Sequence, residues 1–273
     1  MPVFLVINGY FFFSVLARDG QISWFKRVFI LYAVWMLFYS YFWFSMPEAS
    51  ISCFVKLAIY IIIGYWHLWY ISGMLGAAIM LLILRRFSSS FLSSTILIFF
   101  LVGVFIQYLG NYHYFEGSTL DKLLNVYWFH RNMVFFSYPF FCVGYLIHKH
   151  SIHEKITLKF AGALSILGVL SLLGESYLNF YHEGGEGGFD NYLSLLLTCP
   201  FIFILFIKFT ISGNSKTIAL YSSAIYFIHI FFLIIFHGYT KLGATFLTIA
   251  TIIASIVSSY FIIKINKKVK YIL

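Results

Sequence analysis

Apolar stretches that approach the ~20 residues a helix needs to cross a bilayer recur along the whole chain. They are continuous runs such as "LVGVFI" rather than short segments that alternate apolar and polar residues, so they indicate membrane helices and not a β-barrel. Because 62% of the 273 residues are hydrophobic and only 10% are charged, the composition excludes a soluble globular domain. We expect an all-α, multi-pass membrane bundle that forms a single domain over residues 1–273.

The apolar runs predict about nine spanning helices, with boundaries good to a few residues. These are residues 1–17, 28–46, 67–84, 94–110, 132–148, 158–174, 191–207, 218–236 and 243–263. The segment "SCFVKLAIYIII" is short and carries Lys56, so we expect an amphipathic or re-entrant helix there. A tenth crossing at this segment is the alternative.

The charged residues orient these helices. One set of alternate loops contains 14 of the 18 basic residues but only 2 of the 9 acidic residues. Since cytoplasmic loops collect Lys and Arg, this set is assigned to the cytoplasm, which places the carboxyl terminus inside and Met1 outside. The net charge of +9 then reflects membrane topology, and no nucleic-acid partner is expected.

The amino-terminal run "MPVFLVINGYFFF" has no charged residue before it that would direct its insertion toward the outer face. An upstream helix with its amino terminus inside would remove this difficulty, so we expect the domain to be incomplete at this end. A secretory signal peptide that ends at "SVLA" is the competing interpretation, but the basic region of such peptides is lacking.

Lys26 and Arg27 lie at the cytoplasmic end of the second predicted span, in "FKRVFILYAVWML". Membrane topology alone accounts for two basic residues at this position. The functional alternative is a site for an anion, such as the phosphates of a cofactor, because both side chains pair with phosphate oxygens.

The sequence "GYWHLWYISGML" begins the third predicted span and contains His67, Trp69 and Tyr70. Its Trp and Tyr residues are typical of an interfacial aromatic belt, which leaves His67 unexplained. An imidazole can accept a proton from a hydroxyl near neutral pH, and aromatic rings form a suitable wall for a sugar or an acyl group. A solvated interfacial histidine and a catalytic histidine both remain open.

A second histidine, His229, lies inside the apolar run "YSSAIYFIHIFF". Ionisable groups at membrane depth are costly and usually face the bundle interior or a wet cavity, so His229 is a functional candidate. Ser222, Ser223 and Tyr226 on the same helix are candidates to line such a cavity. The alternative is a neutral histidine that is hydrogen-bonded to a neighbouring helix.

Three further features carry weaker signals. Asn8 within the first span either aids helix packing or lies at the edge of a pocket. Arg131 at the start of a span either extends toward the membrane surface or binds an anionic acceptor. The histidines His148, His150 and His153 lie in a basic loop, where we expect no metal site.

Several motifs occur in an order that resembles the acyltransferase-3 family of membrane O-acyltransferases. They are "PVFLVINGY", "FKR" at a helix start, "HLWY" at a later helix start, "PFFCVGYLI" and finally "IYFIH". The resemblance covers nearly the whole chain. The "HLWY" motif is most similar to the branch that acetylates surface polysaccharides or their lipid-linked repeat units.

The resemblance implies a ten-helix enzyme of the cell inner (plasma) membrane that moves an acyl group, commonly acetyl, from cytoplasmic acyl-CoA to a hydroxyl on the outer side. In that family Lys26 and Arg27 match the motif for the acyl donor, His67 and Trp69 match the motif at the acceptor face, and His229 matches the late histidine. The family's first helix, which carries an Arg and a presumed catalytic His, precedes the segment at which this chain begins. The resemblance therefore implies acetyl-CoA as the donor substrate, no metal, a membrane-lipid environment and a polysaccharide or lipid-linked sugar as acceptor.

Two other functions fit the same composition. A transporter or flippase of a lipid-linked sugar would use a similar set of helices, although we find none of the internal repeats common in transporters. An inactive, truncated remnant of the acyltransferase would keep the fold without the missing base.

Overall fold

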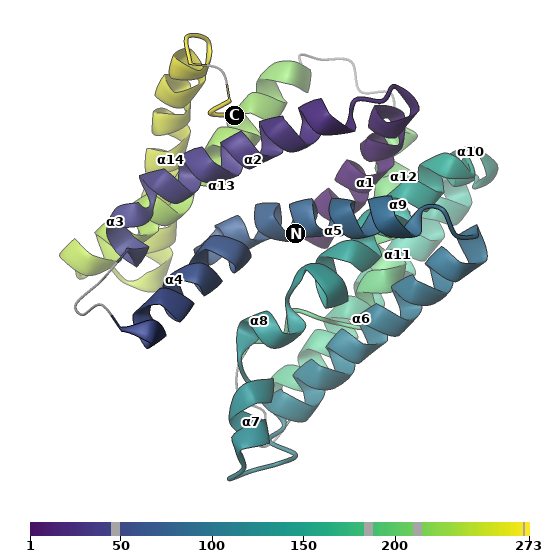
Figure 1. Ribbon diagram of the computed structural model, residues 1–273, viewed down its shortest axis with the longest axis horizontal. Helices are drawn as coiled ribbons and strands as arrows, with labels where there is room; N and C mark the ends of the chain where they lie inside the picture. The colour runs from purple at the N-terminus through teal and green to yellow at the C-terminus, as the bar shows by residue number, and fades with distance from the viewer. Residues whose placement is uncertain (45–49, 183–187, 210–214, 270) are drawn as a thin grey trace. The chain divides into compact units, whose positions relative to one another are not determined.

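The computed structural model describes residues 1–44, 50–182, 188–209, 215–269 and 271–273, and this part of the chain is helical, without strands. It divides into two compact units, which are described separately. Unit 1 contains Met1–Ile22 and Gly73–Thr210, and unit 2 contains Ser23–Ser72 and Ile211–Leu273. Figure 1 labels the helices of both units.

Unit 1 contains the greater number of helices. They are α1 (Pro2–Ala17), most of α5 (Trp69–Leu84), α6 (Ser89–Asn111), α7 (Thr119–Leu124), α8 (Tyr127–His130), a turn of π-helix η2 (Met133–Ser137), α9 (Tyr138–Lys149), α10 (Ile152–Lys155), α11 (Leu158–Phe180) and α12 (Leu195–Ile207). The Asn132 side-chain oxygen starts η2 by accepting hydrogen bonds from the backbone N–H groups of Val134 and Phe135, at 2.8 and 2.9 Å.

Helices α1 and α9 pack with their backbones close together, and two glycines make this approach possible. A Cβ atom at Gly9 would lie 1.8 Å from the carbonyl oxygen of Phe141, and one at Gly144 would lie 2.0 Å from that of Val6. No side chain fits in either space. Gly9, next to Asn8, is therefore a packing residue, as expected for small residues between membrane helices.

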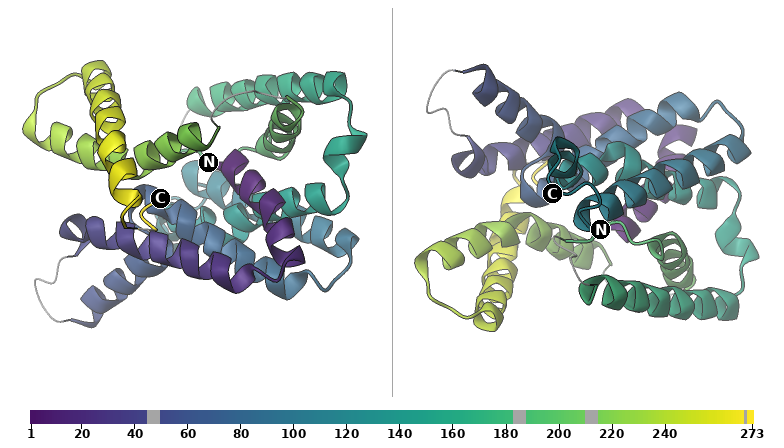
Figure 2. Two further views of the ribbon diagram at one scale, coloured as in Figure 1. Left: turned by 90° about the horizontal axis from the view of Figure 1, so that it is seen from above. Right: turned by 90° about the horizontal axis from the view of Figure 1, so that it is seen from below.

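Unit 2 is built from α2 (Gln21–Phe38), α3 (Ser40–Trp43), α4 (Ile51–Ile63), the 3₁₀ turn η1 (Trp66–Leu68), the first residues of α5, α13 (Ser215–Tyr239) and α14 (Ala244–Asn266). Helices α13 and α14 pack side by side, joined by a short connection that is visible in both views of Figure 2. Aromatic side chains join α2 to the rest of this unit. The Trp35 ring stacks on Phe227 at 4.8 Å, and the Tyr32 hydroxyl donates to the Ile61 carbonyl at 2.7 Å.

Five helices are long and apolar enough to cross a membrane, among the residues that the structure describes. They are Trp66–Leu84, Ser89–Asn111, Leu158–Phe180, Lys216–Tyr239 and Ala244–Asn266. Three shorter apolar helices are Pro2–Ala17, Ile51–Ile63 and Leu195–Ile207. The prediction of an all-α, multi-pass membrane protein is confirmed.

The largest boundary difference concerns the second predicted span, residues 28–46. Helix α2 begins earlier, at Gln21, and ends at Phe38. Lys26 and Arg27 interrupt the apolar run but not the helix, because both residues have good helix propensity. Four charged residues used to orient the helices, Glu48, Glu183, Glu186 and Lys270, lie outside the described residues.

Candidate functional site

A sharp turn between α4 and α5 in unit 2 places His67. Gly64 ends α4 with a φ of +95°, and a Cβ atom there would lie 2.6 Å from the backbone nitrogen of Trp69. Trp66 also has a positive φ, +46°. Because L-residues with side chains rarely adopt this conformation, the turn is strained and closely specified. His67 follows within the turn and is 7% exposed.

His67 lies against His229 of α13, which comes from a distant part of the sequence. The centroids of the two imidazole rings are 5.2 Å apart, with an angle of 62° between the ring planes. Neither ring nitrogen of His67 has a hydrogen-bond partner among the described residues. Since buried polar atoms are normally hydrogen-bonded, two buried nitrogens without a partner mark His67 as a residue that packing alone does not explain.

The contacts of His229 determine its tautomer. Its Nδ1 lies 2.7 Å from the carbonyl oxygen of Tyr226 and 3.2 Å from that of Ile225. A carbonyl oxygen can only accept, so Nδ1 carries a hydrogen and donates it. In the neutral ring Nε2 then holds the lone pair and can accept a proton from another group.

Two tyrosines hold the histidine pair in place. The Tyr39 ring, which is fully buried, contacts His67 with the ring centroids 5.4 Å apart. Its hydroxyl donates to the Phe227 carbonyl at 2.7 Å and accepts from the Phe231 N–H at 3.1 Å, which joins the end of α2 to α13. The Tyr226 hydroxyl donates to the carbonyl of His67 itself. These hydrogen bonds hold the Tyr39 ring beside His67 and tie the turn that carries His67 to α13.

The other predicted residues of unit 2 lie around the pair or at the far end of α2. Tyr70 is buried and contacts Tyr226, with ring centroids 6.0 Å apart, whereas Trp69 is half-buried. Lys26 and Arg27 are exposed. At 1.5 Å per helical residue, they lie about 20 Å along α2 from Tyr39.

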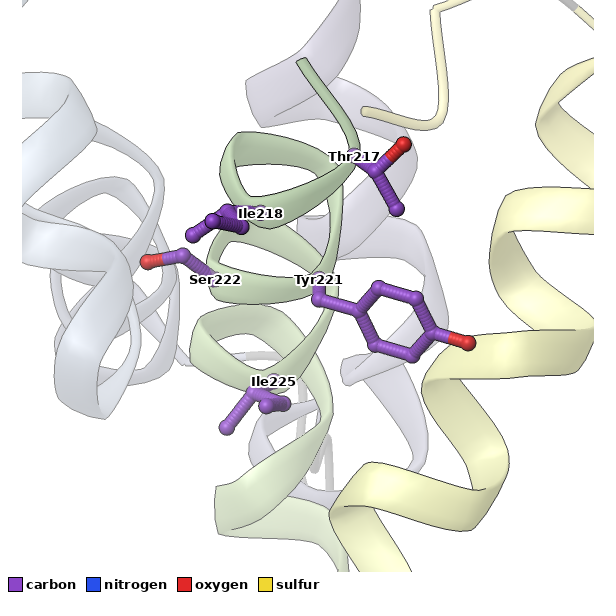
Figure 3. Close-up of a pocket in the computed structure, with 5 residues that line it drawn as sticks. All are labelled: Thr217, Ile218, Tyr221, Ser222 and Ile225. Atoms are coloured by element: carbon purple, nitrogen blue, oxygen red, sulfur yellow. The ribbon is translucent and has the colours of Figure 1, made fainter. Parts of the chain in front are cut away.

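An open groove of about 500 Å³ runs along α13. Its lining residues are Thr217, Ile218, Tyr221, Ser222 and Ile225 (Figure 3). Ile218, Ser222 and Ile225 occupy one edge of the groove, while Tyr221 points toward α14. At steps of four, three and four residues, Ile218, Ser222, Ile225 and His229 share one face of the helix, so this edge leads toward the histidine pair.

Asn8 and Arg131 belong to unit 1, not to the unit that contains the histidine pair. The Asn8 amide donates to the Phe4 carbonyl one turn earlier, at 2.8 Å. Arg131 forms an ion pair with Asp190 at 2.8 Å. The sequence interpretation missed Asp190 as a partner of Arg131, and it missed Tyr39 beside His67. The polar hydroxyl of Tyr39 next to a long apolar run was the available signal.

The model of a protein family described as an acyltransferase domain matches residues 1–264, which is nearly the whole chain and includes both units. No curated protein and no solved structure matches the chain.

Proposed function

The chain belongs to the acyltransferase-3 family, and we propose that it transfers an acetyl group from cytoplasmic acetyl-CoA to a hydroxyl of a surface polysaccharide or lipid-linked sugar. The family match supports a membrane acyltransferase in general. We propose in addition that the donor is acetyl-CoA, that the acyl group is acetyl, that the acceptor is a sugar hydroxyl and that the protein lies in the inner (plasma) membrane. The observation that carries it is the pair of a buried His67 with a half-buried His229, because the two rings lie together and the Nε2 of His229 can accept a proton.

In the proposed reaction His229 Nε2 takes the proton of the acceptor hydroxyl while the hydroxyl oxygen attacks the thioester carbon. The C–O bond forms, a tetrahedral oxyanion develops, and its collapse breaks the C–S bond. The imidazolium returns the proton to the leaving thiolate, so the products are an O-acyl ester and coenzyme A. His67, 5.2 Å away between ring centroids, stabilises the oxyanion by donating from its ring N–H.

The donor half of the proposal rests on α2 and α13. Lys26 and Arg27 are exposed and suited to the phosphates of coenzyme A. The groove on α13 accommodates the long arm between phosphates and thioester, because its Ile218–Ser222–Ile225 edge continues to His229. Trp69 and Tyr70, next to His67, offer ring surfaces to the acceptor.

The first test uses the full chain in lipid nanodiscs with acetyl-labelled acetyl-CoA and the methyl glycosides of glucose, galactose, mannose and N-acetylglucosamine. We expect the label to appear in an alkali-labile sugar ester together with free coenzyme A thiol. Transport of a lipid-linked sugar without any thioester turnover would contradict the proposal and support the transporter alternative.

The second test concerns the donor. Replacing Lys26 and Arg27 together by Ala should raise the KM for acetyl-CoA by about tenfold or more, because two phosphate contacts are lost. The matched control is the double alanine variant of Arg85 and Arg86, an exposed basic pair at the end of α5. An unchanged KM in the Lys26/Arg27 variant, or an equal rise in the control, would show that the donor binds elsewhere.

A further inference from the structure

The charge of the chain is distributed unevenly between the two units. By sequence, unit 1 contains nine basic and eight acidic residues, whereas unit 2 contains nine basic residues and one acidic residue, Glu48. No Asp or Glu side chain occurs in the part of unit 2 that the structure describes, because Glu48 lies outside it. The basic residues of this unit therefore have no side-chain carboxylate of the same described part to neutralise them.

Three of these basic residues lie close together at the carboxyl end of α14. Lys264 is in the last turn of the helix, and Lys267 and Lys268 follow directly after its end; all three are exposed. Residues three and four apart are neighbours on a helix surface, so we call this group the lysine turn. Lysines at a helix end also interact favourably with the helix dipole, so their presence alone does not indicate a ligand.

The lysine turn is fixed by the last residues of the chain. The Asn266 side-chain oxygen accepts from the N–H groups of Ile272 and Leu273, at 3.2 and 3.1 Å. The Ile272 carbonyl accepts from Nε1 of Trp35 on α2 at 2.9 Å, and Trp35 is 3% exposed. These bonds tie the end of α14 to α2. A ligand of the lysine turn therefore meets a preformed backbone, which lowers the entropic cost of binding.

Helix α14 has two different faces. Its buried residues are small and polar: Thr251, Ser255 and Ser259. On another face Ile253, Val257 and Phe261 are each more than half exposed. Lys264 follows Phe261 by three residues and so continues this apolar face. One side of the helix thus presents two turns of apolar side chains that end in the lysine turn.

The exposed face of α14 matches the two parts of a phospholipid. Because α14 is long and apolar enough to cross a membrane, its exposed apolar side chains lie against acyl chains there. The lysine turn at the end of the span then lies at the depth of the headgroups, where ammonium groups pair with phosphate oxygens. An anionic headgroup fits better than a zwitterionic one, whose own cation the lysines repel.

We propose that the exposed face of α14 is a binding site for an anionic phospholipid. The phosphate binds to Lys264, Lys267 and Lys268, and the acyl chains lie along Ile253, Val257 and Phe261. The proposal does not depend on the proposed acyl transfer. The opposing possibility is that the lysines serve only membrane topology and the helix end, in which case the headgroup makes no difference.

The test measures lipid binding to the full chain in detergent micelles by native mass spectrometry. Dioleoyl phosphatidylglycerol and dioleoyl phosphatidylcholine have the same acyl chains and differ in headgroup charge. We expect the wild-type chain to bind phosphatidylglycerol about tenfold more tightly. Replacing Lys264, Lys267 and Lys268 together by Gln should weaken phosphatidylglycerol binding by about tenfold and leave phosphatidylcholine binding unchanged. Equal affinity of the wild-type chain for both lipids would overturn the proposal.

Two further variants separate a specific site from net charge and from misfolding. Replacing Lys149, Lys155 and Lys159 of unit 1 by Gln removes the same charge at exposed positions elsewhere, and should leave the lipid preference in place. Replacing the lysine turn by three Arg residues keeps its charge and should also keep the preference. An equal loss in both Gln variants, or a loss in the Arg variant as large as in its Gln counterpart, would contradict the site.

A soluble competitor distinguishes a lipid from a free phosphate. Glycerol phosphate has the anionic group of the lipid without acyl chains, so the apolar face of α14 adds nothing to its binding. It should not displace phosphatidylglycerol even at about 100-fold excess. Displacement at equal concentration would make the lysine turn a site for soluble phosphates and overturn the lipid assignment.

Discussion

Each unit contains one buried histidine among the described residues, and the surroundings of the two differ. In unit 2, His67 and His229 face each other among the rings of Tyr39, Tyr70 and Tyr226. In unit 1, the backbone carbonyl of His130 accepts from the Asn191 side-chain amide, and the Asn191 N–H donates to the Gln107 side chain, which connects loop segments to the end of α6. An imidazole pair with an aromatic surround is suited to moving protons, whereas a polar network is suited to holding loop segments to helix ends. Under the proposed function, the reaction chemistry belongs to unit 2, and the polar network of unit 1 has a structural role.

The largest loss of stability in unit 1 is expected from a substitution of Glu175. Its carboxylate accepts from the N–H groups of Leu193 and Ser194, at 2.7 and 2.9 Å, and from the hydroxyls of Ser194 and Tyr108, at 2.6 and 2.9 Å. Glu175→Ala leaves four donors without an acceptor and should lower the free energy of unfolding by about 3 kcal/mol or more. Unfolding by SDS in mixed micelles measures the change. Glu175→Gln keeps one acceptor and should lose less; equal losses would show that the network is not held by the carboxylate.

The surroundings of His130 predict a pH dependence of stability. Burial lowers its pKa from 6.5 to about 4; Asp190 raises the pKa, Arg131 opposes that, and a contact with the Leu124 backbone raises it. Below pH 6.5 the unfolded chain binds a proton at His130 that the folded chain does not bind. The contribution of His130 to the free energy of unfolding is therefore constant above that pH and falls between pH 6.5 and pH 4. At pH 5 the loss should be about 2 kcal/mol.

The same SDS titration at pH 7.5 and pH 5 measures this loss, with His130→Gln as the reference. The variant lacks the titrating ring, so its stability should change less over the same interval. An identical pH dependence in both proteins would assign the effect to another group.

Unit 2 is tested by removing one hydroxyl. Tyr39→Phe keeps the ring against His67 but loses the bonds to Phe227 and Phe231. We expect the free energy of unfolding to fall by about 1 kcal/mol, and turnover to fall about fivefold because the pair is less well held. Tyr41→Phe, at a residue that is 88% exposed, should change neither. A normal turnover in Tyr39→Phe would show that the ring alone positions His67.

The smallest effect is expected at the ion pair between Arg131 and Asp190. Its side chains are 27% and 32% exposed, so solvent screens the pair. A double-mutant cycle with Arg131→Gln and Asp190→Asn should give a coupling of about 0.5 kcal/mol that decreases with salt. A coupling several times larger would make this pair a structural element of unit 1 rather than a surface contact.

The sequence predicted the helices well because apolar runs report burial in lipid directly. Helices α11 and α14 begin within one residue of their predicted spans. The short helices α7 and α8 were not predicted, since their few residues have no periodic pattern. Element η2 lies within the predicted span 132–148, but its π-helical form was not predicted. The sequence could identify His229 as a functional candidate, because an ionisable side chain at membrane depth is energetically costly. It could not predict that His67 lies against His229, because that contact depends on the turn at Gly64 and on tertiary packing.

The most direct measurement of the central claim is coenzyme A thiol release in a single turnover at saturating acetyl-CoA with a methyl glycoside acceptor present, because the proposed reaction frees the thiol only when a hydroxyl attacks the thioester. The full chain in nanodiscs is compared with His67→Gln, His229→Gln and the control His237→Gln, an exposed histidine on the same helix as His229. The proposed chemistry predicts that His229→Gln slows release by about 100-fold or more, that His67→Gln slows it by a similar factor, and that His237→Gln changes nothing. Release at the wild-type rate in His229→Gln would contradict the assignment of the histidine pair as the catalytic centre.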